Sequence, residues 1–163
     1  MALACATVAA VTWVIALATL RPSEDERIGQ IVVGAHVRSL MVPGRLADVA
    51  SSDQHTVKPW FIGKLDFAPP VVDFSAAGFT LTGGRLDYVD GRAAAAVTYQ
   101  RRQHVVNFFA WPEKGVADRA PHAQSRQGYS LVGWSRSGMR FCVIADISPV
   151  ELTELAELLR SSS

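Results

Sequence analysis

The first twenty residues place the strongest constraint on what this chain can fold into. All 16 basic residues, all 15 acidic residues and all 4 histidines lie after Leu20, so residues 1–20 carry no charge. A helix of that length extends about 30 Å, which matches the hydrocarbon core of a bilayer. We therefore predict one transmembrane helix at residues 1–20, with the lipid bilayer as a partner.

A cleaved signal peptide is the alternative interpretation of the same stretch. Ala16-Leu17-Ala18 offers small residues of the kind that precede a cleavage site. However, the stretch has no basic residues at its start, and its apolar run is longer than the roughly 7 to 15 residues of a signal peptide. We favour the retained helix. Cleavage would instead leave a secreted periplasmic module that binds a small ligand or a metal.

The rest of the chain has the composition of one folded domain. Hydrophobic residues make up 49% and charged residues 19% of the sequence, a balance typical of a packed core. The length of 163 residues corresponds to one domain, which we place at residues 28–160 after a linker at 21–27. The net charge is +1 with both signs interspersed, which excludes nucleic acid as a partner.

Helical signals stand at both ends of this domain. Apolar residues recur near helical spacing from 24 to 41, after a capping box formed by Ser23 and Glu26. Near the other end, Ser148-Pro149-Val150-Glu151 has the N-cap, the proline and the glutamate that begin a helix, and leucines follow at helical spacing. Residues 161–163 are expected to fray as a short tail.

The segment between these helices has the alternation and turns of antiparallel strands. Asp90-Gly91 is the clearest turn, because this dipeptide favours a two-residue hairpin. The predicted strands form a three-stranded meander and a hairpin: residues 85–89, 92–101, 104–111, 129–135 and 139–145. We expect residues 51–73 to be irregular but ordered, and 112–127 to be a surface loop. The predicted class is α+β, a transmembrane helix followed by an antiparallel sheet of about five strands flanked by two helices.

No constellation of catalytic residues is evident. The serines lack a nucleophile-elbow context, and no two histidines have the spacing of zinc ligands. Asp53 and His55 are better explained by local hydrogen bonds than by a metal site, and His36 is expected to be interfacial or solvated. Cys142 falls within a predicted strand and is expected to be buried. We therefore predict no enzyme activity, no catalytic residue, no metal and no cofactor.

One long run of residues has a specific resemblance. Asp48-Val49-Ala50-Ser51-Ser52-Asp53-Gln54-His55-Thr56-Val57-Lys58-Pro59-Trp60-Phe61-Ile62-Gly63-Lys64-Leu65-Asp66-Phe67-Ala68-Pro69-Pro70-Val71 resembles the signature of bacterial transmembrane anti-sigma factors. The likeness continues through Gly83-Gly84-Arg85-Leu86-Asp87-Tyr88 and through Arg102-Gln103-His104-Val105-Val106-Asn107 to Trp111-Pro112. It covers most of residues 35–147.

The resemblance implies a location and a partner. In this family a zinc-binding domain in the cytoplasm sequesters an ECF-type sigma factor, one helix crosses the bacterial inner membrane, and a periplasmic domain follows. This sequence begins at the predicted helix, and no His-x-x-x-Cys-x-x-Cys segment precedes it. We therefore expect a single-pass membrane-anchored sensor portion, which relays an envelope signal to a sigma-binding module that this chain does not contain.

The same resemblance suggests where a signal would be received, from a periplasmic ligand or a regulatory protease. The irregular segment concentrates charged and aromatic groups, and binding residues often lie on such loops. The predicted signal-sensing residues are Asp53, His55, Lys58, Trp60, Lys64 and Asp66. The alternative is that these groups only hold the loop against the sheet.

Overall fold

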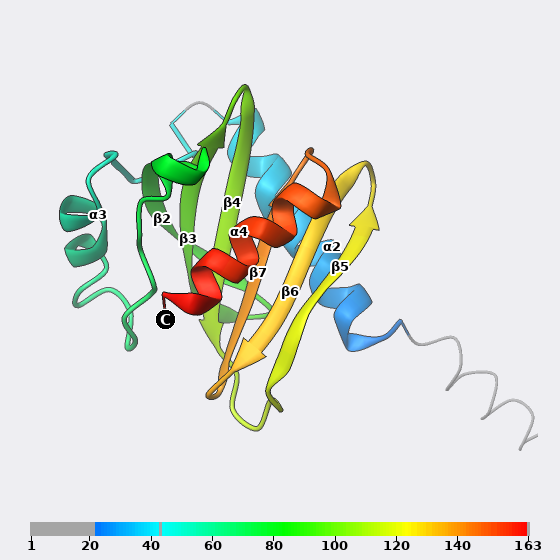
Figure 1. The fold of residues 1–163 in the computed structure, drawn as a ribbon. Coiled ribbons are helices and arrows are strands. Elements are labelled where there is room, and N and C mark those ends of the chain that lie inside the picture. The colour runs from blue at the N-terminus through cyan, green and yellow to red at the C-terminus, as the bar shows by residue number, and fades with distance from the viewer. Residues whose placement is uncertain (1–21, 43, 163) are drawn as a thin grey trace, which may run out of the picture.

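The computed structural model describes residues 22–42 and 44–162, which form an α+β domain (Figure 1). Its helices are α2 (Glu24–Met41), α3 (Gln54–Trp60) and α4 (Pro149–Ser161), with a short 3₁₀ turn η1 (Ser75–Ala77). Its strands are β1 (Val49–Ala50), β2 (Thr80–Val89), β3 (Arg92–Arg101), β4 (His104–Pro112), β5 (Arg119–Arg126), β6 (Tyr129–Arg136) and β7 (Met139–Ala145).

All seven described strands belong to one antiparallel sheet with the order β1-β2-β3-β4-β7-β6-β5. The chain thus forms two meanders, β2–β4 and β5–β7, which join where β4 pairs with β7. The class is α+β, but the prediction of about five strands is wrong. β1 has only two residues, and the sequence predicts a loop where β5 lies, because Pro121 and the polar residues around it give no sign of its pairing with β6.

The membrane prediction also needs correction. Among residues 22–42 and 44–162, no helix is long and apolar enough to span a membrane. The helix predicted at residues 1–20 lies outside the described residues. This finding goes against the predicted single-pass location in the bacterial inner membrane with a periplasmic main domain, and we withdraw that prediction.

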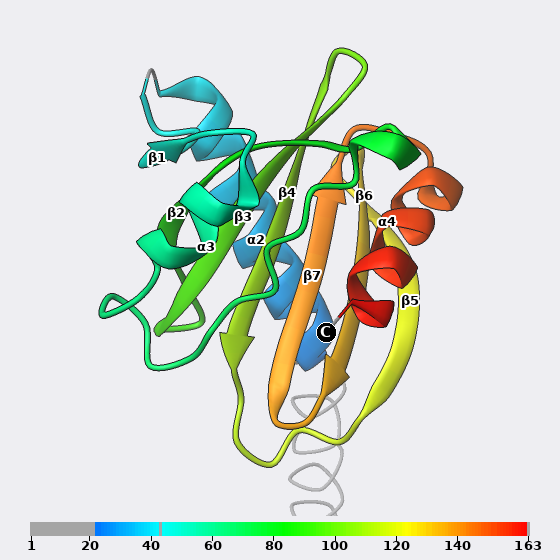
Figure 2. The same cartoon turned by 60° about the vertical axis from the view of Figure 1, so that its left-hand side comes forward.

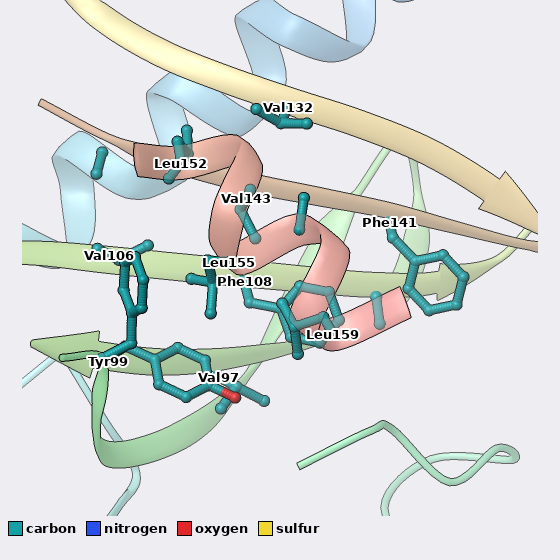
Figure 3. Packing of buried hydrophobic residues seen from close by; sticks show 14 of the residues in the cluster. Val97, Tyr99, Val106, Phe108, Val132, Phe141, Val143, Leu152, Leu155 and Leu159 are labelled. Carbon is teal, nitrogen blue, oxygen red and sulfur yellow. The ribbon is translucent and has the colours of Figure 1, made fainter. Parts of the chain in front are cut away.

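The sheet has a helix on each face, so it divides the core into two layers (Figures 1 and 2). α2 covers one face, and Val32 and Val33 are buried there against residues such as Phe109 and Ile144. α4 covers part of the other face, where its leucines lie above the sheet (Figure 3). The buried residues of this second layer include Leu152, Leu155, Leu159, Phe108 and Val143.

Both long helices begin with the caps that the sequence indicates. The Ser23 hydroxyl accepts a hydrogen bond from the Glu26 backbone N–H, and the Glu26 carboxylate accepts one from the Ser23 N–H in return. The Ser148 hydroxyl accepts from the Glu151 N–H at the start of α4. Side-chain caps of this kind fix the first turn of each helix, because they satisfy donors that have no partner within the helix.

α3 and the coil that follows it cover the rest of the α4 face of the sheet (Figure 2). The sequence predicted an irregular segment here, and the helix is a correction. Val57 and Phe61 are buried beneath α3, where they lie against Gly84 of β2. A Cβ atom at Gly84 would stand 2.9 Å from Phe61 Cζ and 3.1 Å from Val57 Cγ1, so α3 approaches the sheet as closely as a glycine allows.

Substitution of Gly84 by alanine should therefore loosen α3. The added methyl group must displace Phe61, and overpacking of this kind costs about 1 to 3 kcal/mol. Urea denaturation of the wild type, Gly84→Ala, Phe61→Leu and the double variant would measure it. Gly84→Ala should cost less in the Phe61→Leu background, where the ring is gone. Additive losses would show that the close approach does not constrain this site.

Candidate functional site

α3 forms the first half of the predicted sensing surface, and Asp53 is its N-cap. One carboxylate oxygen accepts a hydrogen bond from the His55 N–H at 2.8 Å, and the other accepts from the Thr56 hydroxyl at 3.2 Å. The Ser51 hydroxyl accepts from the Asp53 N–H at 3.0 Å. Asp53 thus makes the local bonds that the alternative interpretation expects, and its role here is to start the helix.

Trp60 and Lys64 hold the turn that follows α3. The Lys64 ammonium lies 4.5 Å from the centroid of the Trp60 ring and donates a hydrogen bond to the Trp60 carbonyl at 3.0 Å. The Trp60 ring stands edge-on to Phe61, with centroids 5.2 Å apart. The half-buried Trp60 therefore joins the exposed turn to the buried Phe61 beneath it.

The other three predicted residues, His55, Lys58 and Asp66, have exposed side chains. In the described part of the chain, the side chains of His55, Lys58 and Asp66 make no hydrogen bond or ion pair. Lys58 and Asp66 line one groove of about 470 Å³, and His55 and Lys58 line a neighbouring one of about 290 Å³. The structure thus brings these three residues to adjoining hollows, whereas Asp53, Trp60 and Lys64 line neither.

The larger groove, which we name the α3 groove, is mainly apolar. Ile62 stands in it with 79% of its surface exposed. The other side chains that define its wall are Pro59, Phe61, Leu65, Phe67 and Pro69. An open apolar hollow with one cation and one carboxylate at its rim has the general form of a small-ligand site.

The coil beyond the α3 groove is fixed by side-chain bonds to the backbone. The Gln54 side-chain oxygen accepts from the Asp73 N–H at 3.0 Å, and the Asp73 carboxylate accepts from the Leu81 N–H at 2.9 Å. The Tyr99 hydroxyl donates to the Val72 carbonyl at 2.9 Å, and burial raises the pKa of this phenol. These bonds fix the coil beyond the α3 groove, and two of their residues, Gln54 and Val72, line the smaller neighbouring hollow.

On the opposite face, sequence reasoning missed a buried polar network centred on Asn107 of β4. Its amide nitrogen donates to the Ser39 hydroxyl at 3.0 Å and contacts His36 Nδ1 at 2.8 Å, and both partners lie on α2. Its amide oxygen accepts from the Arg85 guanidinium of β2 at 3.2 Å. Both N–H groups of the Asn107 amide are thus used and its oxygen accepts from Arg85, while the Thr98 hydroxyl lies 3.2 Å from the same oxygen.

The network continues to the connection between α2 and β1. The Leu46 carbonyl accepts from Arg85 at 3.1 Å, and the Thr98 hydroxyl lies 3.1 Å from it. Arg85 also pairs with the Asp87 carboxylate at 3.0 Å and lies over the Phe109 ring. Arg85 is only 5% exposed, so a charged guanidinium is held inside the domain by these partners.

His36 is fully buried in this network, which corrects the expectation of an interfacial or solvated residue. Because Asn107 donates to Nδ1, the neutral imidazole carries its proton on Nε2, which has no partner among the described residues. Burial, with a smaller contribution from the Arg85 charge, lowers the pKa of His36 from 6.5 to about 4. The imidazole is therefore neutral at physiological pH.

Other chemistry in the described residues is limited. Residues 22–42 and 44–162 contain no group of three or more His, Cys, Asp or Glu side chains placed to hold a metal ion. Burial raises the pKa of the Cys142 thiol to about 12, so this thiol is protonated at neutral pH. No protein-family model matches the sequence, and no curated protein matches it.

The buried His36 should make the domain sensitive to acid. Its folded-state pKa of about 4 lies below the ordinary 6.5, so the unfolded chain binds the proton more readily. The contribution of neutral His36 to the free energy of unfolding is fully present above about pH 6.5. It decreases as the pH drops towards 4, by on the order of 3 kcal/mol.

Urea unfolding at a series of pH values would measure this loss in three proteins. The wild type and His55→Gln, whose histidine is exposed, should lose stability in parallel, whereas His36→Gln should have a shallower slope between pH 6.5 and 4. An equal slope in His36→Gln would contradict the assignment of the effect to His36.

Proposed function

We propose that this domain is the signal-receiving part of a regulatory protein of the anti-sigma type. In this proposal, binding at the α3 groove changes the packing of the domain, and that change controls whether a sigma-binding module elsewhere holds or releases its sigma factor. The residues that resemble the family signature support the proposal, since they form α3, the turn after it and the walls of the groove.

The observation that carries the proposal is the exposed apolar surface of the α3 groove. Val57 and Phe61 fix α3 to the sheet, but Ile62 points outward and contributes little to the domain's own core. Large apolar side chains gathered in a hollow, rather than scattered singly, commonly mark a place where a ligand or partner docks. Lys58 and Asp66 at the rim would orient such a ligand.

A route from the α3 groove to α2 runs through two adjacent residues of β2. Successive side chains of a strand point to opposite faces of a sheet. Gly84 contacts Phe61 on the α3 face, and Arg85 joins the Asn107 network, with His36 of α2, on the other. A ligand that moves Phe61 would therefore press on the strand that positions Arg85. It changes the state of α2 only if it binds the two packing states with different affinities.

A second candidate is a small-ligand binding module that acts without a sigma factor. The volume of the α3 groove, about 470 Å³, falls within the roughly 300 to 1,000 Å³ of typical small-molecule sites. The two candidates differ in their partner. Purification of the native protein from its source, followed by mass spectrometry, should recover a sigma subunit of RNA polymerase under the first proposal. Recovery without any sigma subunit would favour the second.

Substitutions in the α3 groove should abolish the response to a signal without unfolding the domain. Ile62→Ser and Lys58→Ala change exposed side chains, so the free energy of unfolding should stay within about 0.5 kcal/mol of the wild type. Response of a sigma-dependent reporter, measured in the native organism, should fall at least about fivefold, the lower range of allosteric coupling.

Val150→Ser is the matched control, because Val150 is 80% exposed on α4, away from the groove. It should leave both stability and response unchanged. If Ile62→Ser and Lys58→Ala kept a wild-type response, the α3 groove would not be the place where the signal acts.

A further inference from the structure

A cleft on the α2 face of the sheet is separate from the α3 groove. It has a volume of about 260 Å³ and lies between the C-terminal part of α2, the connection to β1 and the outer part of β2. The charged and polar residues that line it are Arg38, Ser39, Arg45, Asp48, Arg85 and Asp87. We name it the arginine cleft.

Three arginines from three separate segments line the arginine cleft. Arg38 comes from α2, Arg45 from the connection to β1, and Arg85 from β2. Arg38 and Arg45 are exposed, and within residues 22–42 and 44–162 neither side chain has a hydrogen bond or an ion pair. Arg85 lies at the back of the cleft and is 5% exposed.

The two carboxylates of the cleft are already engaged. One Asp87 oxygen accepts from Arg85 Nε at 3.2 Å and Nη2 at 3.0 Å, and the other accepts from the Tyr88 N–H at 2.8 Å. Asp48 accepts from the Leu86 N–H at 3.1 Å. The cleft therefore retains an excess of positive charge and two cationic forks without acceptors. Burial lowers the pKa of Arg85 despite Asp87, so a further negative charge nearby would be favourable.

We propose that the arginine cleft binds a small polyvalent oxyanion, one that carries phosphate or carboxylate groups. The planar guanidinium matches both groups, since two parallel N–H donors meet two oxygens. Arg38 and Arg45 would clamp the anion from two sides. Arg85 has one N–H of Nη2 not engaged by Asp87 and would face the anion from the back. The volume is below that of typical drug-sized sites, which selects a compact anion.

Such an anion would tie α2 to the connection that follows it and to β2. Its contact with Arg85 would be a direct contact with the Asn107 network, because Arg85 donates to Asn107. Binding would thus stabilise the docked state of α2. The arginine cleft lies on the other face of the sheet from the α3 groove, and anion binding there requires no sigma factor.

Calorimetric titration of the full chain with inorganic phosphate at constant ionic strength and pH 7.5 would test it, with citrate as the carboxylate probe. The wild type should bind at least one probe. Arg38→Gln and Arg45→Gln should each weaken that binding about tenfold or more, since each removes one charge-assisted fork. Lys114→Gln, which removes an exposed charge outside the cleft, should bind like the wild type.

The relative affinities for phosphate and citrate distinguish the two classes of anion, and the affinities of the variants test whether the cleft is the binding site. Preference for phosphate identifies a phosphate-bearing ligand, and preference for citrate a polycarboxylate; both support the cleft. Because Arg38 and Arg45 are exposed, their variants should unfold at the wild-type urea concentration. No binding of either probe, or equal affinity in the wild type, Arg38→Gln and Arg45→Gln, would overturn the proposal.

Discussion

The Asn107 side chain joins more of this domain than any other polar group described above. It interrupts the apolar stretch of β4 from Val105 to Trp111, and it binds α2 through His36 and Ser39 and binds β2 through Arg85. A buried amide of this kind adds little net stability when all its bonds are made, but each unmade bond costs about 1 to 3 kcal/mol. Its two partners on α2, His36 and Ser39, are bonded in this register of the helix, so the network favours this docking of α2 on the sheet.

β2 connects this network to the opposite face of the sheet. One of its residues, Gly84, lies directly under Phe61, the C-cap residue of α3, and the next, Arg85, is held by Asn107 on the opposite face. The two faces of the sheet, and with them the α3 groove and the arginine cleft, therefore share one short piece of backbone. Coupling between two sites needs an element that both can bias. Among the described strands, β2 carries a contact on each side: Gly84 lies under Phe61 of the α3 groove, and Arg85 lines the arginine cleft.

Local signals in the sequence predicted local structure well. The capping residues Ser23 and Ser148 locate α2 and α4, and the Asp90-Gly91 turn locates the hairpin of β2 and β3. Signals failed where pairing is decided by neighbours in space. The polar sequence of β5 shows no alternation, but its backbone hydrogen bonds are completed by β6. The helix predicted at residues 1–20 is a separate matter, since those residues lie outside the described part of the chain.

Sequence signals located the segment of the candidate site, because that segment is local in the chain, but they did not show which of its side chains line a hollow. The segment that forms α3 and its turn was identified, and Lys58, His55 and Asp66 prove to line hollows, whereas Asp53 and Trp60 serve the local structure. Whether the segment senses a signal stays a prediction. The Asn107 network could have been suspected, since an asparagine between Val106 and Phe108 interrupts an apolar strand. The arginine cleft could not, because only the topology brings its three arginines together.

We propose that the Asn107 network couples α2 to the sheet and, through β2, to α3. Native-state hydrogen exchange of Asn107→Ala tests it most directly, with Val106→Ala as the control, because Val106 is buried in the same strand but faces the α4 side. Asn107→Ala should lower the protection of amide hydrogens in α2 and α3 together while α4 keeps its protection, and Val106→Ala should not reproduce this pattern. Loss of protection in α2 alone, or an equal loss in every element, would contradict it.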